Sequence, residues 1–170
     1  MNIRNATLED AHVICDIYNY YIENTAISFE TEPILESEMR RRMYEIINSN
    51  CYSFYVGEID GKIIGYCYTH PWNNRRAYAS TQEVSIYLDP MATGKGFGTM
   101  LFNYLLTLID KNRIHVLIAG ICIPNESSIR LHEKFGFKQI SNFKEVGRKF
   151  GQWHDVGHWQ LIFNSSIKNF

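Results

Sequence analysis

A glycine-rich turn is the segment of this sequence with the clearest chemical meaning. An apolar run that ends at Leu88 breaks at Pro90, and the chain restarts through Gly94, Gly96 and Gly98 as a helical pattern. Alternate glycines of this kind expose successive backbone N–H groups at the start of a helix, where the helix dipole also favours an anion. The segment therefore predicts a phosphate cradle, with a plain tight turn as the alternative.

Two common nucleotide motifs do not fit this turn. A dinucleotide-binding fingerprint that starts at Gly94 would need glycine where Thr99 stands, and no acidic residue follows at a strand end about 20 residues later. A Walker A loop would need Ser or Thr after Lys95, where this chain has Gly96. The turn is thus predicted to bind a phosphate group of another kind of ligand.

A second candidate site combines one arginine with several aromatic side chains. Arg75 stands in a predicted loop between Trp72 and Tyr78. An arginine fork can bind a carboxylate or a tetrahedral phosphinate through two hydrogen bonds, and Phe29, Trp72 and Tyr78 would supply aromatic walls for such a pocket. The alternative is a solvated loop arginine with no ligand.

The cysteines and two spaced histidines have simpler explanations. None of the four cysteines forms a C-x-x-C pair or stands at a clear helix start, so all are expected to be free thiols in or near the core. They are Cys15, Cys51, Cys67 and Cys122. His154 and His158 are four residues apart, but no third ligand accompanies them, so no metal site is predicted.

Periodicity predicts a mixed α/β order of elements. Apolar spacing and turn residues favour strands at residues 3–6, 52–59, 62–70, 81–88 and 116–123, two further strands within residues 139–163, and helices near residues 11–22, 36–48, 96–112 and 125–135. Asp60-Gly61 predicts a hairpin, and Gly136 predicts a helix end. Because strands and helices do not strictly alternate, we expect one α/β domain over residues 1–170 with a mixed sheet, and not a doubly wound fold.

Charge and hydropathy limit the possible partners. The 17 basic residues nearly balance the 18 acidic ones, and a net charge of -1 lacks the basic excess typical of nucleic-acid binding. The most apolar run, residues 116–123, is far shorter than the roughly 20 residues that cross a bilayer. No secretion signal is evident at the N-terminus. We expect a cytoplasmic protein with neither nucleic acid nor membrane as partner.

The turn and the segment that follows it resemble a known superfamily. The glycine turn, the strand after it and the pattern Asn125-x-x-Ser128-x-x-x-His132-x-x-x-Gly136-Phe137 resemble the acetyl-CoA site of GNAT N-acetyltransferases. The chain departs from the superfamily pattern at Thr93, where a long polar residue is usual, but the cradle itself is built from backbone.

A closer resemblance covers nearly the whole chain and is to phosphinothricin and methionine sulfoximine N-acetyltransferases. The residues that carry it are Ile17-Tyr18-Asn19, Phe29-Glu30-Thr31-Glu32-Pro33, Pro71-Trp72, Arg75, Ala77-Tyr78, Glu83, Tyr87, Pro124-Asn125, Arg130-x-His132-Glu133 and Trp153-His154-Asp155-Val156-Gly157-x-Trp159-Gln160-Leu161. Many matches in the same order are more specific than any single motif.

The resemblance implies a fold, a cosubstrate and an assembly. The fold would be a mixed, mostly antiparallel sheet flanked by helices, the acetyl donor acetyl-CoA and the assembly a homodimer, with residues 153–161 as a possible interface. Pantetheine would pair with Ile86, Tyr87 and Leu88, and Asn125 would bind the cofactor arm. The pyrophosphate would be held by Gly94, Lys95, Gly96, Phe97, Gly98 and Thr99.

Acetyl transfer to an amine needs a proton acceptor. An α-amino group with a pKa of about 7.7 to 8.0 is mostly protonated at pH 7 and must lose a proton before it attacks. Glu83, three residues before Ile86, and His132, seven residues after Asn125, are the candidates. Which of the two takes the amine proton stays open, and an exposed strand carboxylate and a structural histidine are the alternatives.

The predicted activity is acetylation of the α-amino group of a small amino-acid-like substrate, of the phosphinothricin or methionine sulfoximine type. One alternative is an acetyltransferase of protein N-termini, lysines or other amines. Another is a noncatalytic acyl-CoA-binding module, which the presence of both Glu83 and His132 argues against.

Overall fold

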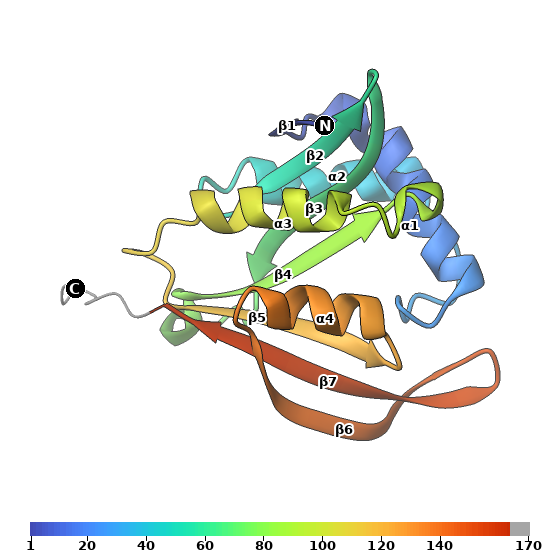
Figure 1. The fold of residues 1–170 in the computed structure, drawn as a ribbon, viewed down its shortest axis with the longest axis vertical. Helices are drawn as coiled ribbons and strands as arrows, with labels where there is room; N and C mark the ends of the chain where they lie inside the picture. Colours follow the sequence, from blue (N-terminus) through green and yellow to red (C-terminus); the bar gives the residue numbers. More distant parts are fainter. Residues whose placement is uncertain (164–170) are drawn as a thin grey trace. The chain divides into compact units, whose positions relative to one another are not determined.

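The computed structural model describes residues 1–163, and residues 164–170 of the predicted domain lie outside the described part. Seven strands form a sheet in the order β1-β2-β3-β4-β5-β7-β6 (Figure 1). The strands are β1 (Asn2–Asn5), β2 (Phe54–Ile59), β3 (Lys62–Pro71), β4 (Thr81–Leu88), β5 (Val116–Ile123), β6 (Lys138–Lys149) and β7 (Gln152–Ile162). The α-helices are α1 (Ala11–Asn24), α2 (Glu36–Ile47), α3 (Phe97–Leu108) and α4 (Glu126–Lys134).

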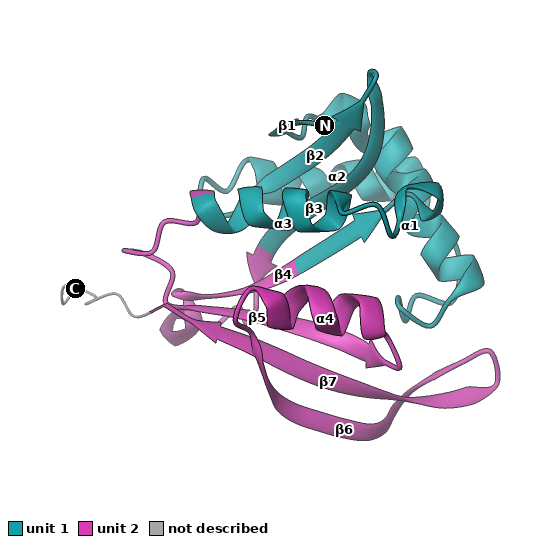
Figure 2. Cartoon of the chain, viewed as in Figure 1, with its two compact units in different colours: residues 1–69, 85–107 teal, residues 70–84, 108–170 magenta. Residues whose placement is uncertain are grey.

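Strand direction confirms the expected mixed sheet. β4 and β5 run parallel, whereas β1 with β2, β2 with β3, β5 with β7 and β6 with β7 are antiparallel. The chain separates into two compact units, each built from two stretches of sequence (Figure 2). The first unit holds residues 1–69 and 85–107, and the second holds residues 70–84 and those from 108 onward.

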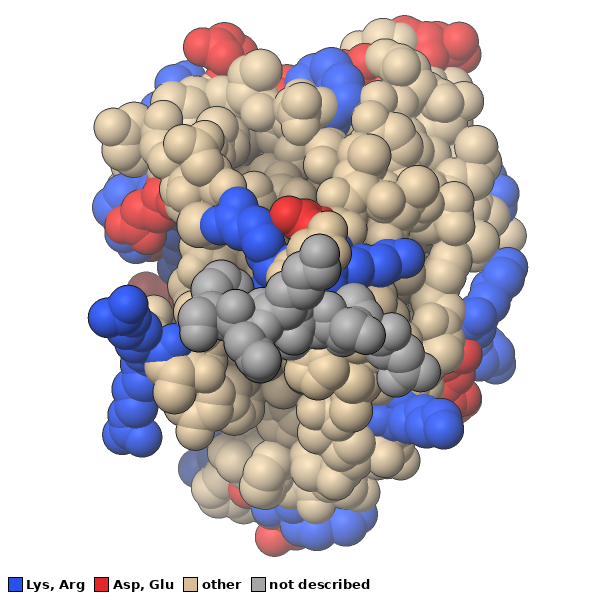
Figure 3. All heavy atoms as spheres, turned by 90° about the vertical axis from the view of Figure 1, so that its left-hand side faces the viewer, with Lys and Arg blue, Asp and Glu red and all other residues tan. Residues whose placement is uncertain are grey.

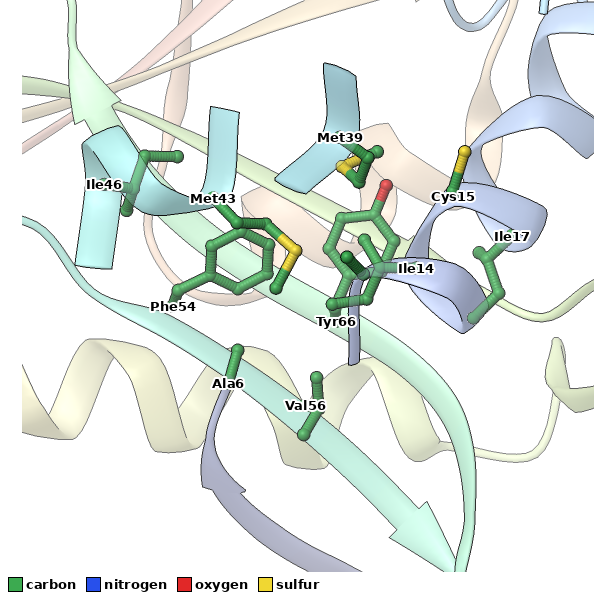
Figure 4. Packing of buried hydrophobic residues seen from close by; sticks show 11 residues of the cluster. Ala6, Ile14, Cys15, Ile17, Met39, Met43, Ile46, Phe54, Val56 and Tyr66 are labelled. Carbon is green, nitrogen blue, oxygen red and sulfur yellow. The ribbon is translucent and has the colours of Figure 1, made fainter. Parts of the chain in front are cut away.

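The core of the first unit joins α1 and α2 to β2 and β3. Met39 and Met43 are one turn apart on α2 and face inward, while Phe54 and Val56 alternate along β2. Figure 4 shows these side chains with Tyr66 of β3 in one cluster. The hairpin between β2 and β3 turns at Asp60 and Gly61, with φ of 49° and 75°, as the Asp-Gly pair predicts.

The second unit packs α4 on one face of β5 and β7. Trp159 of β7 is buried, and its indole Nε1 donates to Glu133 Oε1 of α4 at 3.2 Å. Side chains alternate along a strand, so His158, next to Trp159, points to the opposite face of the sheet. His158 pairs in register with Gly120 of β5. The second unit therefore has a face covered by α4 and a face that carries His158.

Three details differ from the sequence predictions. The helix expected to end near residue 112 ends at Leu108, because Asp110 starts a turn in which its Oδ1 accepts from Asn112 N at 3.0 Å. The break expected across residues 147–151 is confined to Phe150 and Gly151, where φ is 50° and 75°.

Cys51 is the third difference, because it is exposed, whereas the other three cysteines are buried as expected. Burial raises the pKa of the Cys15, Cys67 and Cys122 thiols. A raised pKa disfavours the reactive thiolate, so these three residues are suited to packing and not to nucleophilic chemistry.

The surface charges and the hydropathy of the helices can be examined in residues 1–163. On the face in Figure 3, Lys and Arg side chains are interspersed with Asp, Glu and uncharged residues. Within residues 1–163, no helix is long and apolar enough to span a bilayer.

Candidate active site

The predicted phosphate cradle forms the start of α3. Gly94 and Gly96 have φ of 73° and 83°, a region that disfavours other residue types. A Cβ at either glycine would meet no atom within 4 Å, so open space lies over this backbone. The first backbone bond into the helix runs from Met100 N to Gly96 O at 3.2 Å. The N–H groups of residues 97–99 precede that bond and are available to an anion.

The loop before the cradle is held by its own polar groups. Asp89 Oδ1 accepts from Met91 N at 2.8 Å and caps a short 3₁₀ turn, Pro90–Ala92. Lys95 Nζ donates to Met91 O at 2.8 Å, which keeps the ammonium group beside the turn. The cradle therefore combines helix N–H groups with one nearby cation, and an anionic pyrophosphate fits this donor set.

The end of β4 is fixed by contacts within the first unit. The Tyr21 hydroxyl donates to Leu88 O at 2.6 Å. A Cβ at Gly65 of β3 would lie 2.8 Å from Tyr87 O and 3.2 Å from Leu88 Cα, so only glycine permits this close approach. Residues 86–88 also lie past the last described pair of β4 with β5, Glu83↔Ile118. Residues 86–88, which are predicted to bind pantetheine, are therefore held in place by these contacts. The Leu88 carbonyl already accepts one hydrogen bond, from Tyr21.

Glu83 occupies an accessible position on β4. Its side chain is 33% exposed, and Oε2 lies 4.0 Å from His70 Nε2. Its Oε1 lies 3.5 Å from the position that a Cβ at Gly120 would take. Because Gly120 pairs with His158, Glu83 faces the side of the sheet that carries His158. A partly exposed carboxylate at this place can reach a ligand.

His132 lies on α4, on the other face of the second unit, and is only 2% exposed. Its Nδ1 is 2.8 Å from Ser128 O, and a carbonyl only accepts, so Nδ1 carries the proton. Burial lowers the pKa of His132, although the bond to Ser128 opposes this effect. The ring is therefore neutral at pH 7, with its lone pair on Nε2. The structure does not bring His132 and Glu83 together on one face.

The pKa of His132 predicts a pH dependence of stability. An unfolded histidine titrates near about pH 6.5, and the folded state holds this ring neutral to lower pH. The unfolded state thus binds more protons below that pH, so the free energy of unfolding should fall as pH drops from about 6.5 to 5.5. His132→Asn, which keeps a side-chain donor for Ser128, should show a weaker decline. Urea unfolding at several pH values measures both slopes, and equal slopes would contradict the assignment.

Asn125 serves as the N-cap of α4. Its Oδ1 accepts from Ser128 N at 3.2 Å and from Ser127 Oγ at 3.0 Å. Its Nδ2 takes no part in this cap. The predicted contact of Asn125 with a cofactor arm would therefore use the amide nitrogen as donor.

Three of the four predicted acceptor residues lie in the second unit. Trp72 and Tyr78 pack edge to face, with ring centroids 5.3 Å apart. Arg75 begins the short turn before Tyr78, and its backbone N–H donates to Asn73 Oδ1 at 3.0 Å. Within residues 1–163, no carboxylate lies in ion-pair distance of the exposed Arg75 guanidinium. Phe29 belongs to the first unit and is partly exposed.

Sequence reasoning missed three residues beside Glu83. His70 ends β3 next to the Glu83 carboxylate, and Gly120 and His158 pair across β5 and β7. A glycine inside the apolar run 116–123 was the available signal, because a strand glycine often marks a close approach of a ligand or of backbone. His158 was considered only as a metal ligand. Among residues 1–163, no three His, Cys, Asp or Glu side chains group as a metal site would require.

Comparison with known proteins gives consistent matches. A family model described as an acetyltransferase (GNAT) domain matches residues 3–158. The phosphinothricin N-acetyltransferase of Streptomyces viridochromogenes is 35% identical over 96% of this chain and 88% of its own. The L-methionine sulfoximine/L-methionine sulfone acetyltransferase of Salmonella typhimurium is 34% identical over 95% of this chain and 94% of its own.

A solved structure matches over nearly the full length. It is a GNAT superfamily phosphinothricin acetyltransferase from Sinorhizobium meliloti in complex with acetyl-CoA. The alignment has a TM-score of 0.92 and 33% identity, and it covers 99% of this chain and 91% of the other.

Proposed function

The chain belongs to the GNAT acetyltransferase family and is an acetyl-CoA-dependent acyltransferase, and from this premise we propose that its acceptor is the α-amino group of a small amino-acid-like molecule. The named relatives suggest phosphinothricin or methionine sulfoximine as examples of the class. Family membership confirms the expected enzyme and leaves the noncatalytic binding module without support. The observation that carries the proposal is Glu83, a partly exposed carboxylate on the strand that leads into the phosphate cradle.

Acetyl-CoA supplies the acetyl group as a thioester. The N–H groups of residues 97–99 and Lys95 would hold its pyrophosphate, because the positive φ of Gly94 and Gly96 leaves open space over the backbone. Backbone groups of residues 86–88 would hold the pantetheine, and Asn125 Nδ2 would donate to the same arm. Tyr21 and Gly65 support this function indirectly, since they position the end of β4.

Glu83 is the better candidate for accepting the amine proton. Its carboxylate is accessible, whereas His132 is buried on the other face of the sheet. Neutral His132 has no proton on Nε2, so it can accept a proton but cannot donate one to a leaving thiolate without being protonated first. We therefore propose that Glu83 accepts the proton of the amine. Any proton that His132 handles during turnover would be one that its Nε2 accepts.

Arg75 would bind the acidic group of the acceptor. Arg75 is exposed and lies between Trp72 and Tyr78 in the sequence, and its planar fork suits a carboxylate or phosphinate. Arg75→Lys should raise the KM for the acceptor about tenfold and leave acetyl-CoA affinity unchanged, because lysine loses the bidentate geometry. Steady-state kinetics and calorimetry test this. Equal losses for both ligands would indicate misfolding and contradict the assignment.

The function is tested with a panel of amines. Release of free CoA from acetyl-CoA is measured with phosphinothricin, methionine sulfoximine, the common amino acids and a peptide with a free N-terminus. Turnover with the small amino-acid analogues supports the proposal. Turnover with the peptide alone would replace it with the protein N-terminus alternative.

We also propose a homodimer, with an interface that uses side chains in and next to residues 153–161. β7 lies between β5 and β6, so the hydrogen-bonding edges of residues 153–161 are already used. Exposed apolar side chains in this region include Phe143 and Val146 of β6, Phe150 of the turn that follows and Trp153 of β7. Trp153→Glu should dissociate the dimer in sedimentation velocity, and a wild-type protein that sediments only as a monomer would refute the assembly.

A further inference from the structure

The loop between α1 and α2 carries an aromatic side chain between two anchored residues. This loop spans residues 25–35 and forms neither helix nor strand. Phe29, one of the residues predicted to line the acceptor pocket, lies in it and is 38% exposed. We propose that Arg42 of α2 is a positioning residue for the acceptor, because its ion pair with Glu30 holds Phe29 in the place where it contacts that molecule. The proposal rests on the proposed function and deepens it, since it names a residue outside the predicted site on which acceptor affinity depends.

Two sets of contacts tie the loop to α1. Near the end of the loop, Asn19 Nδ2 donates to Ile34 O at 3.0 Å, and Asn19 Oδ1 accepts from Ile34 N at 2.9 Å. In the middle, the buried Ser28 hydroxyl lies 3.0 Å from the Tyr18 hydroxyl. Ser28 directly precedes Phe29, so one neighbour of the exposed aromatic residue is fixed to α1.

Arg42 ties the other neighbour of Phe29 to α2. Its Nη2 lies 2.8 Å from Glu30 Oε1, and its Nε donates to Glu38 Oε1 at 2.8 Å. Glu38 is four residues before Arg42 on the same helix, so this second bond orients the guanidinium for the contact with Glu30. A rigid planar fork suits such a bridge between two carboxylates. Because both its neighbours are anchored, Phe29 should lose little conformational freedom when a ligand binds, and this favours affinity.

The loop lies beside the end of β4, which leads into the phosphate cradle. The ring of Tyr18, whose hydroxyl contacts Ser28, packs edge to face on Tyr87 with centroids 5.3 Å apart. Tyr87 is one of the residues 86–88 that we propose to bind pantetheine. The loop, α1 and this end of β4 all belong to the first unit. A loop anchored at this place can present Phe29 to a molecule that binds next to the acetyl donor.

Removal of the Arg42 charge should weaken acceptor binding without slowing the chemical step. Arg42→Gln should raise the acceptor KM about three- to fivefold, the size of one partly exposed charge pair, with kcat and acetyl-CoA affinity unchanged. Glu30→Gln breaks the same pair and should have the same effect, so the double variant should lose no more than either single variant. Kinetics use whichever amine the wild type acetylates. A wild-type KM in Arg42→Gln, or multiplicative effects in the double variant, would overturn the proposal.

Arg41→Gln is the matched control. Arg41 precedes Arg42 on α2, and its guanidinium pairs with Glu38 and Glu45 of the same helix. The control therefore loses helix-surface ion pairs of the same kind, so its thermal midpoint should resemble that of Arg42→Gln. Its acceptor KM should remain that of the wild type. An equal rise of KM in both variants would indicate a general effect on α2 and would contradict the proposal.

A variant of Phe29 tests whether Arg42 acts through this aromatic ring. Phe29→Ala should raise the acceptor KM by itself. Arg42→Gln should then have no further effect when it is added to Phe29→Ala, because the ring that the ion pair positions is gone. A wild-type KM in Phe29→Ala, or a further rise in the double variant, would show that Arg42 does not act in this way.

Hydrogen exchange makes the test independent of turnover. Backbone amides of residues 26–33 should exchange faster in Arg42→Gln and Glu30→Gln than in the wild type, and at the wild-type rate in Arg41→Gln. Exchange that is unchanged in Arg42→Gln would overturn the proposal. The amine panel with the wild-type protein decides the acceptor class by itself, so failure of the proposed function and failure of this inference are distinguishable.

Discussion

Glu83→Gln is expected to lower kcat by about 10² to 10⁴ while acetyl-CoA affinity stays within a factor of about two, the size of a general-base effect. Glutamine has nearly the same shape as glutamate, so packing near His70 and Gly120 is preserved. It cannot take a proton from the acceptor amine. The measurement is steady-state kinetics with a saturating acceptor, together with calorimetry for acetyl-CoA.

The control for this variant is an exposed carboxylate that is not among the proposed site residues. Glu23→Gln changes an exposed residue of α1 and should keep the wild-type rate. A pH profile gives a second readout, because the ascending limb of kcat/KM should disappear in Glu83→Gln once the titration of the substrate amine is subtracted. Wild-type turnover by Glu83→Gln across the profile would remove Glu83 from the mechanism.

A variant of His132 tests whether Glu83 and His132 act in the same catalytic step. His132→Asn should also lower kcat if its Nε2 accepts a proton during turnover. In that case the double variant should lose less than the product of the two single effects, because residues that act in one step are not additive. A full multiplicative loss would mean that the two residues act independently, as their places on opposite faces would allow.

Gly96→Val is expected to weaken acetyl-CoA binding by about 10- to 100-fold. The Cβ and its methyl groups would occupy the open space over the first turn of α3, and the loss of one or two charge-assisted hydrogen bonds corresponds to about 1.5 to 3 kcal/mol. Valine at a φ of 83° also costs stability, about 1 to 2 kcal/mol. Calorimetry with acetyl-CoA and thermal unfolding without it measure the two effects separately.

Gly61→Val separates backbone strain from the loss of a ligand site. Gly61 has a φ of 75°, and its missing Cβ also meets nothing within 4 Å, but it lies in the hairpin between β2 and β3. It should lose a similar amount of stability and keep the acetyl-CoA affinity of the wild type. Equal affinity in Gly96→Val and Gly61→Val would place the pyrophosphate elsewhere.

The elements of the fold were predictable because their signals are local. The strands at residues 81–88 and 116–123 have the predicted bounds, since each is a short apolar or β-branched run between turn residues. The Asp60-Gly61 hairpin and the glycine turn before α3 were also predictable, because positive φ depends on the residue type at the position itself. Glycine spacing alone therefore located the turn that we propose as the phosphate cradle.

The proposed acceptor side of the site depends on strand register, which single positions do not encode. Glu83, Gly120 and His158 are far apart in the sequence and meet because Glu83 pairs with Ile118 and Gly120 pairs with His158. A slip of one residue in either pairing would turn one of these side chains to the α4 face. Register follows from the packing of whole strands, so the proximity of these three residues could not be predicted from local sequence.

The state of His132 shows the same division between local and tertiary information. Its helix was predictable from spacing and from Asn125 as a cap, but its burial was not, because burial depends on Phe137 and on the sheet face that α4 covers. Desolvation then lowers the pKa of the ring, and the Ser128 carbonyl selects which nitrogen carries the proton. The sequence by itself therefore determined the family, most of the elements and the glycine turn before α3. Only the tertiary structure decided which face each proton-accepting group occupies, because side-chain direction and solvent exposure arise from contacts between distant segments.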